Sequence, residues 1–496
     1  MDRNALLNEV LTRSRPWDLL VIGGGATGVG CALDAATRGL DVLLLERNDL
    51  GSGTSARSTK LVHGGIRYLR EGDLRLVREA LYERGLLLAN APHIVAKRRF
   101  VVPCYSRWQQ AFYGAGLKLY DALSRSLSFG RSSLISRDRT IELLPEVETE
   151  GLRGGIVYYD GQFDDSRLLI DMAVTAHRNG SRILNYACVL GLERSGGEWI
   201  VQYEDVLTGN RSETRARSVI NACGAYVDPV RRMSDASATP VVTFARGTHL
   251  VLPRHFLSGE AALVIPRTRD GRVLFCIPWH DRLLVGTTDV LCGTAEEGDK
   301  PTDAEIDFLL ETAGRSLQRQ PRRDDVLSMF AGVRPLVSRG RVANTSKLSR
   351  SHELLIDARG LVTITGGKWT TYRRMAEEAV NAAVSGADIK AGPCATHTLR
   401  IDPPAAADGE LLHADLPYTI GDIVRAVTSE MAVTLEDVLE RRLRCVHLDA
   451  RTSLDAAPRV SRIMREQLGI SDEQIDLRGF TEKVEALNLP AAGDRG

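Results

Sequence analysis

The stretch from Asp18 to Glu46 limits what this chain can fold into more than any other part of it. It opens with an apolar run, Leu19 to Ile22, that lacks polar alternation and therefore predicts a buried parallel strand. Three glycines follow at the spacing Gly-x-Gly-x-x-Gly, and these are Gly23, Gly25 and Gly28. This spacing, after a strand and before a helix, is typical of a turn that binds a dinucleotide.

The three glycines have different roles in such a turn. Gly23 allows the tight bend, Gly25 lets the backbone approach a pyrophosphate, and Gly28 lets the next helix pack closely on the strand. The N-terminus of that helix carries free N–H groups and a partial positive charge, which favour bound phosphates. A second apolar strand ends on Glu46, whose carboxylate can accept hydrogen bonds from an adenosine ribose. Because these elements occur together and in order, they predict a dinucleotide site and not merely an ordinary βαβ unit.

Composition and charge exclude several classes of protein. The chain of 496 residues suffices for two or three domains, and its 64 basic and 64 acidic residues give no net charge that would favour nucleic acid. The eight cysteines lack a Cys-x-x-Cys pair, so we expect no disulfide framework, zinc site, iron–sulfur cluster or other metal site. No apolar run approaches the ~18–20 residues of a membrane span, and residues 1–15 lack the apolar centre of a signal peptide. We expect a cytoplasmic protein, or one lying on a membrane without crossing it.

Two polar stretches with glycine come next in the chain. Residues 51–60 are small and polar, and such a loop offers backbone N–H groups and hydroxyls to phosphates and to a ring system. In residues 61–69, two adjacent glycines stand between His63 on one side and Arg67 and Tyr68 on the other. This arrangement indicates backbone that passes close to a ligand.

Residues 106–127 predict an amphipathic helix. Apolar residues from Trp108 to Leu123 recur at spacings of three and four, and basic residues such as Lys118 occupy the other side. A face of this kind suits a helix in a bilayer interface, but most such stripes pack into a protein core. The pattern leaves both alternatives open.

The order of the expected elements indicates a discontinuous α/β fold. Short apolar runs split by turns, including the hairpin signal Asp270-Gly271, predict a mixed or antiparallel sheet between residues 239 and 290. A later strand ends in Gly366-Gly367-Lys368 and opens a helix, as in the first stretch. Residues 402–410 have the composition of a linker, and those after it read as helices.

We therefore predict three domains. A discontinuous Rossmann-like dinucleotide-binding domain comprises residues 16–90, 150–232 and 345–390. An inserted substrate domain, or cap, with a mixed or antiparallel sheet comprises residues 91–149 and 233–344. A small helical domain comprises residues 411–496.

Two stretches are specific enough to compare with known families, and they are His63-Gly64-Gly65-Ile66-Arg67-Tyr68 and Gly366-Gly367-Lys368-Trp369-Thr370-Thr371-Tyr372-Arg373. Further stretches are Arg75–Leu81, Ala91–His93, Asp164–Leu168, Gly286–Asp289 and Gly332–Pro335. Together with the glycine turn they resemble the FAD-dependent glycerol-3-phosphate dehydrogenases, which are aerobic, quinone-linked flavoenzymes. The chain departs from the family's pattern at Cys223, where threonine is usual, at Trp369, where leucine is common, and in a shorter C-terminal helical region.

The resemblance implies FAD as the cofactor and glycerol 3-phosphate as the substrate, which would be oxidised at C2 to dihydroxyacetone phosphate by hydride transfer. The residues implied to bind FAD are Gly23, Gly25, Ala26, Thr27, Gly28, Glu46, Arg47, Thr54, Ser55, Ser58, Thr59, Lys60, Val189, Gly224, Gly366, Gly367, Lys368, Trp369 and Thr370. Those implied to bind substrate are Arg67, Tyr68, His249, Arg334, Lys368 and Thr371, and the catalytic set is His63, Arg67, Arg334 and Lys368.

The chemistry assigns tasks to some of these residues. Arginine suits a phosphate because its fork gives paired, charge-assisted hydrogen bonds. Lys368 and the helix start beside it can stabilise negative charge on a reduced flavin. For the proton acceptor we favour His63, since a neutral imidazole is available near pH 7, while His249 or a water held by Arg67 remains an alternative.

The resemblance also implies an electron acceptor, either a quinone or another molecule. It is compatible with a homodimer and with peripheral contact of residues 106–127 with the inner face of the cytoplasmic membrane. Three other functions stay open at this point: an oxidase that passes electrons to oxygen, an amino-acid oxidase of the same fold, and a non-catalytic FAD-binding sensor.

Overall fold

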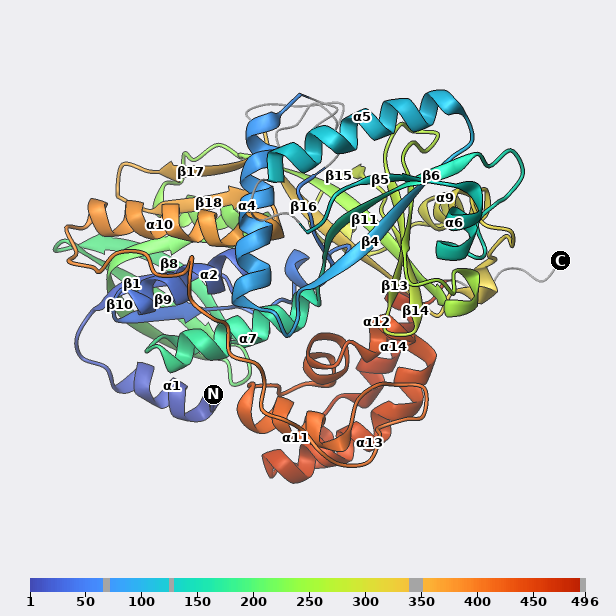
Figure 1. Cartoon of the computed structure of the whole chain (residues 1–496). Coiled ribbons are helices and arrows are strands. Elements are labelled where there is room, and N and C mark those ends of the chain that lie inside the picture. Colours follow the sequence, from blue (N-terminus) through green and yellow to red (C-terminus); the bar gives the residue numbers. More distant parts are fainter. Residues whose placement is uncertain (66–71, 125–128, 339–350, 491–496) are drawn as a thin grey trace.

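Two β-sheets and a helical C-terminal unit make up the protein (Figure 1). The structure is a computed structural model that describes residues 1–65, 72–124, 129–338 and 351–490. Separate apolar cores lie against the helices of the first sheet, between the second sheet and its helix α9 (Asp303–Gly314), and within the C-terminal unit. The arrangement confirms the predicted discontinuous α/β fold with an inserted sheet and a helical end.

The first sheet has eight strands, of which five run parallel. Strand β1 (Trp17–Ile22) pairs with β2 (Val42–Leu45) on one side and with β10 (Asn210–Asn221) on the other, and β10 pairs with β18 (Val362–Gly366). The remaining strands are β7 (Arg182–Leu184), β8 (Ala187–Ser195), β9 (Glu198–Asp205) and β17 (His352–Ile356). Some neighbouring strands thus come from distant segments, as Trp17 of β1 lies opposite Ala216 of β10.

Three helices pack together over this sheet. The central one, α2 (Ala26–Thr37), contacts α7 (Asp165–Arg178) and α10 (Tyr372–Gly386). Its small buried residues allow close approach, and a Cβ at Gly30 would lie 2.9 Å from the Tyr372 ring. Helix α7 is capped by Asp164, whose carboxylate accepts from Arg167 N. The other helices of this region are α1 (Arg3–Thr12) and α8 (Val227–Ser234).

The second sheet has ten strands and is mixed, because β4 pairs in parallel with β12 but antiparallel with β6. Its strands are β3 (Leu61–Val62), β4 (Ala96–Cys104), β5 (Ser133–Ile135), β6 (Gly154–Gln162), β11 (Val242–Pro253), β12 (Ala262–Ile265), β13 (Leu274–Trp279), β14 (Arg282–Gly286), β15 (Val290–Cys292) and β16 (Ser328–Val337). The predicted boundaries would assign β3 and β6 to the dinucleotide domain, whereas their hydrogen bonds place them in the second sheet. Strand β6 pairs with β4 over its whole length, which local sequence does not reveal.

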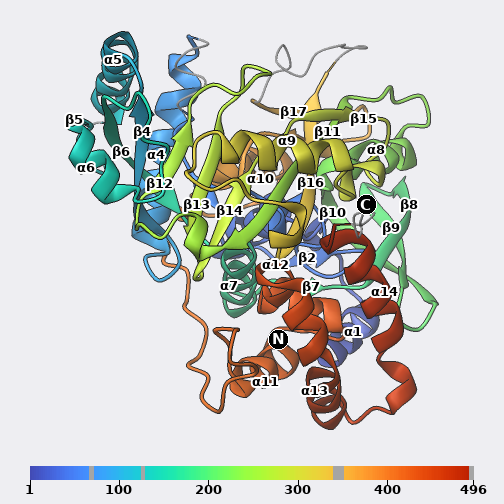
Figure 2. The ribbon, with the colours of Figure 1, turned by 90° about the vertical axis from the view of Figure 1, so that its right-hand side faces the viewer.

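Helices flank the second sheet. Helix α9 lies across its strands (Figure 2) and starts at a capping box of Thr302 and Glu305. The others are α4 (Leu74–Asn90), α5 (Arg107–Ser124) and α6 (Arg137–Leu143). Within the described ranges, every helix is too short or too polar to span a lipid bilayer.

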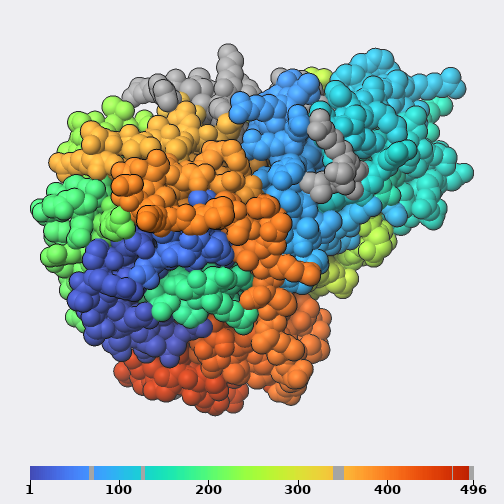
Figure 3. All heavy atoms as spheres, turned by 60° about the vertical axis from the view of Figure 1, so that its left-hand side comes forward, coloured from blue at the N-terminus to red at the C-terminus, as the bar shows by residue number. Residues whose placement is uncertain are grey.

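The C-terminal unit is helical, as predicted. It contains α11 (Ile420–Ser429), the π-helix η9 (Asp437–Arg442), α12 (Cys445–Leu448), α13 (Ala450–Leu468) and α14 (Leu477–Asn488). Between α13 and α14 lies the 3-10 turn η10 (Asp472–Gln474). The N-terminal residues lie against this unit (Figure 3), and the amino group of Met1 donates to Ser429 O at 2.9 Å.

Candidate active site

A cavity of about 630 Å³ lies at the carboxyl ends of the central parallel strands. Its lining includes Ile22, Leu45 and Gly366, the last residues of β1, β2 and β18. Ligands of doubly wound sheets bind at this edge. Residues of the second sheet, including His249 and Arg334, complete the lining, so both sheets contribute to one site.

The glycine turn has the geometry that its spacing predicts. Gly23 has a φ of +112°, and a Cβ there would lie 2.8 Å from Ala222 O. A Cβ at Gly28 would lie 1.9 Å from Gly23 O, so this glycine is required for the helix to pack on the strand. It does not line the cavity, in contrast to Gly23 and Gly25. Ser55 Oγ accepts a hydrogen bond from Ala26 N at 2.9 Å at the start of α2.

Glu46 lies in the cavity wall at the end of β2. Its carboxylate accepts hydrogen bonds from Gly24 N at 2.5 Å and from Asn48 N at 2.8 Å. Burial raises the pKa of Glu46, and these two backbone N–H groups partly offset the effect. The carboxylate is therefore held in place by the turn beside which a ribose would lie.

Seventeen of the nineteen residues predicted to bind the cofactor line the cavity; the two that do not are Gly28 and Lys60. The ammonium group of Lys60 is fully buried behind the loop, 2.7 Å from Asp165 Oδ2 and 3.0 Å from Ala56 O. The prediction for Lys60 assumed that a polar loop turns all its polar side chains to the ligand. Because a buried lysine needs a carboxylate partner, the position of Asp165 decides its direction.

A second cavity of about 160 Å³ adjoins the first and shares Thr59, Leu61, His63 and Arg334 with it. The smaller cavity is lined by two arginines, because Arg272 also reaches it. Sequence reasoning missed Arg272, although the hairpin signal Asp270-Gly271 stands directly before it.

Arg334 is oriented by three hydrogen bonds. Its guanidinium donates to Thr288 O at 3.1 Å, to Asp289 Oδ1 at 3.2 Å and to Thr287 Oγ1 at 3.0 Å. A Cβ at Gly247 would lie 2.3 Å from the guanidinium, so glycine on the neighbouring strand β11 leaves the space for it. The side chain is 22% exposed, which leaves it accessible to a ligand in either cavity.

The turn that carries His63 is fixed by its backbone. Gly64 N donates to the hydroxyl of Tyr120 at 2.8 Å, and this hydroxyl donates to Asp160 Oδ2 at 2.7 Å. Asp160 lines the smaller cavity and is paired with Arg84 at 2.7 Å. A Cβ at Gly64 would lie 2.4 Å from the Tyr120 hydroxyl, which explains the glycine after His63.

His249 is held as a neutral imidazole. Its Nε2 lies 2.9 Å from Thr59 Oγ1, and its ring stacks on Phe330 with centroids 4.9 Å apart. Burial, followed by the positive charges of Lys60 and Arg334, keeps the pKa of His249 well below its usual range. The ring can thus hydrogen-bond in the site but is a weak proton acceptor.

The second glycine-rich turn also lies at the larger cavity. Gly366 and Gly367 have φ angles of +78° and +70°, and Trp369 Nε1 donates to Ser55 O at 2.8 Å, which joins this turn to the loop after β2. Thr371, predicted to contact substrate, lines neither cavity; it is buried, and its hydroxyl donates to Lys368 O at 3.2 Å. The Thr371 hydroxyl thus stabilises the turn that precedes α10.

Two further points concern this site: the position of Cys223, and that of Arg67 and Tyr68. Cys223 lines the cavity, and its thiol donates to Ile22 O at 3.2 Å, a bond that a threonine hydroxyl at this place can also make. Burial raises the pKa of this thiol well above its usual range, so it stays protonated. Arg67 and Tyr68 lie outside the described residues.

The larger cavity fits FAD. It combines a carboxylate at the ribose position, a glycine turn at a helix start, hydroxyls of Thr54 and Ser55, and a second turn that carries Lys368. An adenosine, a pyrophosphate and a flavin ring need these groups in this order.

Family models match most of the chain. Residues 18–373 match the FAD-dependent oxidoreductases, and residues 392–475 match the C-terminal domain of alpha-glycerophosphate oxidase. The second match covers much of the C-terminal helical unit.

Relatives agree with these matches. The chain is 36% identical to the mitochondrial glycerol-3-phosphate dehydrogenase of Bos taurus over 94% of this chain and 72% of the relative, and 42% identical to that of Arabidopsis thaliana over 79% and 64%. Among solved structures, glycerol-3-phosphate dehydrogenase from Bacillus halodurans complexed with FAD has a TM-score of 0.77 and 26% identity, with 98% of this chain and 97% of that chain covered.

These similarities extend over both the cofactor-binding part and the helical end. FAD is accordingly the cofactor of the larger cavity. The chain belongs to the FAD-dependent oxidoreductases and, within them, to the family of FAD-dependent glycerol-3-phosphate dehydrogenases.

Proposed function

We propose that this protein oxidises sn-glycerol 3-phosphate at C2 to dihydroxyacetone phosphate and passes the electrons to a quinone. The observation that carries the proposal is the pair of arginines, Arg272 and Arg334, in a cavity of about 160 Å³ that adjoins the FAD cavity. A dianionic phosphate needs concentrated positive charge, and arginine provides it as paired hydrogen bonds.

The oxidation needs a hydride acceptor, a group that binds the phosphate and a group that accepts the hydroxyl proton. FAD, when bound, supplies the acceptor for the hydride from C2. Arg334, held by its three hydrogen bonds, binds the phosphate or an adjacent hydroxyl without having to reorganise. Asp160 also faces this cavity, and its pairing with Arg84 and Tyr120 keeps its negative charge from repelling the substrate.

We propose that the ring of His63 accepts the proton of the C2 hydroxyl. His63 lines both cavities, so it lies where cofactor and substrate would meet. His249 is less suitable because Nε2 is already hydrogen-bonded to Thr59 and its pKa is strongly lowered. We assign it the role of fixing Thr59 at the cofactor.

The direct test is an anaerobic titration of the purified holoenzyme with glycerol 3-phosphate. We expect the visible flavin absorbance to bleach in proportion to substrate. Failure to bleach would favour a sensor, and bleaching by amino acids alone would indicate an amino-acid oxidase. In air, one peroxide per substrate consumed would identify an oxidase instead of a quinone-linked dehydrogenase.

Replacement of Arg334 tests the site itself. Arg334→Ala should lower kcat/KM by a factor on the order of 10²–10³ with FAD still bound, because it removes a charge-assisted contact to substrate. The matched control is Arg269→Ala, an arginine that is 63% exposed and pairs with Glu311 on the surface. Equal activities of the two variants would contradict the role of Arg334.

We further propose that α5 contacts a membrane from which the quinone is drawn. Trp108 and Phe112 are 68% and 49% exposed and their rings stack at 4.9 Å, whereas Leu117 and Tyr120 on the other side of the helix are buried. An exposed aromatic face on an amphipathic helix suits the bilayer interface. The membrane would be the inner face of the cytoplasmic membrane.

Liposome co-sedimentation tests this contact. Phe112→Asp should reduce binding to anionic vesicles, and Leu207→Asp, which alters an exposed leucine of the β9–β10 turn, should not. Unchanged binding of Phe112→Asp would contradict the proposal. A homodimer stays a prediction that light scattering of the holoenzyme would test.

A further inference from the structure

The loop after β2, residues 49–60, is called here the cofactor loop, and its two sides differ. Its front lines the FAD cavity through Gly51–Ser55 and Arg57–Thr59. Its back carries Asp49, Lys60 and the carbonyl of Ala56, which are buried against other parts of the chain. None of the described residues after 411 lines the FAD cavity, yet several of them hold this back side.

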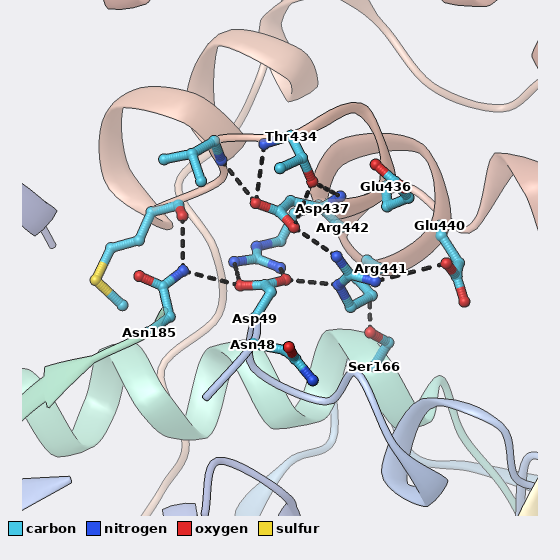
Figure 4. A network of polar contacts seen from close by, with 12 residues as sticks. Asn48, Asp49, Ser166, Asn185, Thr434, Glu436, Asp437, Glu440, Arg441 and Arg442 are labelled. Atoms are coloured by element: carbon cyan, nitrogen blue, oxygen red, sulfur yellow. Dashed lines mark hydrogen bonds and ion pairs between the residues drawn. The ribbon is translucent and has the colours of Figure 1, made fainter. Parts of the chain in front are cut away.

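The first contact lies at Asp49, which is fully buried (Figure 4). Its carboxylate accepts from Arg442 Nη1 at 2.6 Å, from Arg442 Nη2 at 2.9 Å and from Arg441 Nε at 2.7 Å. Both arginines belong to the π-helix η9 of the C-terminal unit. Ser166 Oγ donates to Arg441 O at 2.7 Å, which ties the same turn to the start of α7.

The second contact lies at the 3-10 turn η1 (Thr54–Ala56), in the middle of the loop. Ala56 O accepts from Lys60 Nζ at 3.0 Å and from Arg444 Nη2 at 2.7 Å. Arg444 is fully buried in the left-handed backbone region, with a φ of +61°. Thr54 and Ser55, the other two residues of the turn, line the cavity, so Arg444 holds the residue that directly follows them in the chain.

The third contact involves a cavity-lining residue directly. Arg57 lines the FAD cavity, and its guanidinium pairs with Glu440 at 3.3 Å and with Asp299 at 2.8 Å. Glu440 is buried, and the His447 ring, followed by the charges of Arg57 and Arg441, keeps its pKa well below the usual range in spite of desolvation. Glu440 therefore stays charged. Together with Asp299, it holds Arg57 between the C-terminal unit and the second sheet.

Stability alone does not account for such a set of charges. Burying ion pairs costs desolvation energy, and apolar residues of similar volume often stabilise a fold as well or better. What directional charged bonds provide is one defined geometry, and a binding loop that is already in its bound geometry pays less entropy when the ligand arrives.

We propose that residues 437–444 of the C-terminal unit position the cofactor loop and thereby determine how tightly FAD is held. Arg444 acts through Ala56, and Glu440 acts through Arg57. Both are positioning residues that touch neither cofactor nor substrate. The inference goes beyond the oxidation of glycerol 3-phosphate and holds whatever the substrate is.

The test follows release of FAD from diluted holoenzyme by the rise in free flavin fluorescence. Arg444→Met should release FAD about tenfold faster, because one charge-assisted bond that holds the loop is lost; a tenfold change corresponds to about 1.4 kcal/mol. The matched control is Arg425→Met in the same unit. Arg425 is 14% exposed and pairs with Asp422 and Glu430, with no contact to the cofactor loop among its hydrogen bonds.

The outcomes separate positioning from general stability. The proposal requires that Arg425→Met lowers the melting temperature to a similar degree while releasing FAD at the wild-type rate. Equal release rates in the two variants would overturn it. If Arg444→Met does not fold, Glu440→Gln decides, because it keeps size and shape; a wild-type release rate there would equally overturn the proposal, and a severalfold faster one would support it.

Discussion

The two loops at the cofactor site are supported in different ways. The cofactor loop, residues 49–60, is backed by buried charges from a segment nearly four hundred positions away in the chain. The His63 turn is backed by the hydroxyl of Tyr120 from α5, which accepts a hydrogen bond from Gly64 N and donates one to Asp160. The first support is ionic and the second is centred on one neutral hydroxyl.

This difference predicts different consequences of failure. Breaking a buried ion pair leaves a charge without compensation, so the cost falls on the stability of the whole fold. Removing a hydroxyl from a ring that still packs costs less stability, but it frees the turn that carries His63, the proposed proton acceptor. The cofactor loop should therefore be sensitive in folding and the His63 turn in catalysis.

The largest effect is expected for Asp49→Asn. Arg441 and Arg442 would lose their shared carboxylate, and the free energy of unfolding should fall by about 3–5 kcal/mol. Urea denaturation of the holoenzyme measures it, with added FAD to hold the cofactor constant. A loss below about 1 kcal/mol would show that this network is no stronger than surface pairs.

The same carboxylate predicts how stability depends on pH. Burial alone would raise the pKa of Asp49, but Arg442 and Arg441 lower it to about 2. An unfolded aspartate titrates near ~3.9, so the ionised Asp49 stabilises the native state fully above that pH. This stabilisation is lost as pH falls from about 4 towards 2. Asp49→Asn should lack this part of the acid dependence, which parallel denaturation series at these pH values would reveal.

A smaller effect, on catalysis, is expected for Tyr120→Phe. The ring still packs, but Gly64 N and Asp160 each lose a partner, a loss of about 1–3 kcal/mol. We expect kcat/KM to fall roughly tenfold with an unchanged rate of FAD release. The matched control is Tyr105→Phe, whose hydroxyl donates to Glu148 O at 3.0 Å away from both cavities. A large change in FAD release, or equal activities of the two variants, would contradict the separation of the two supports.

The sequence predicts the residues that line the cavity better than the residues that support the two loops. The strand, glycine turn and helix from Trp17 to Thr37 are local, and periodicity and spacing were sufficient to place them. Seventeen of the FAD residues that the family resemblance implied also line the cavity, and some of them, such as Gly23 and Glu46, directly follow strand ends. The site residues themselves stay predictions as to their roles.

Local sequence patterns could not predict the residues that support the two loops. Asp49 and Arg442 are 393 positions apart, so no local pattern connects them. The sequence does not single out Tyr120, and only the fold shows that its hydroxyl reaches Gly64. Lys60 and Thr371 stand in motifs but point away from the cavities, because side-chain direction at a turn depends on tertiary partners such as Asp165.

The smallest effect is expected for Arg323→Ala, which tests whether burial is what separates the two kinds of charge. Arg323 pairs with Asp303 at 2.6 Å and with Asp307 at 2.8 Å, distances as short as those at Asp49, but the two carboxylates are 68% and 61% exposed. Water screens such pairs, so the free energy of unfolding should change by only about 0–1 kcal/mol and the change should vanish in high salt. Urea denaturation at two salt concentrations measures it. A loss as large as that of Asp49→Asn would mean that geometry and not burial sets the strength of these networks, and the contrast between the two supports would then need another cause.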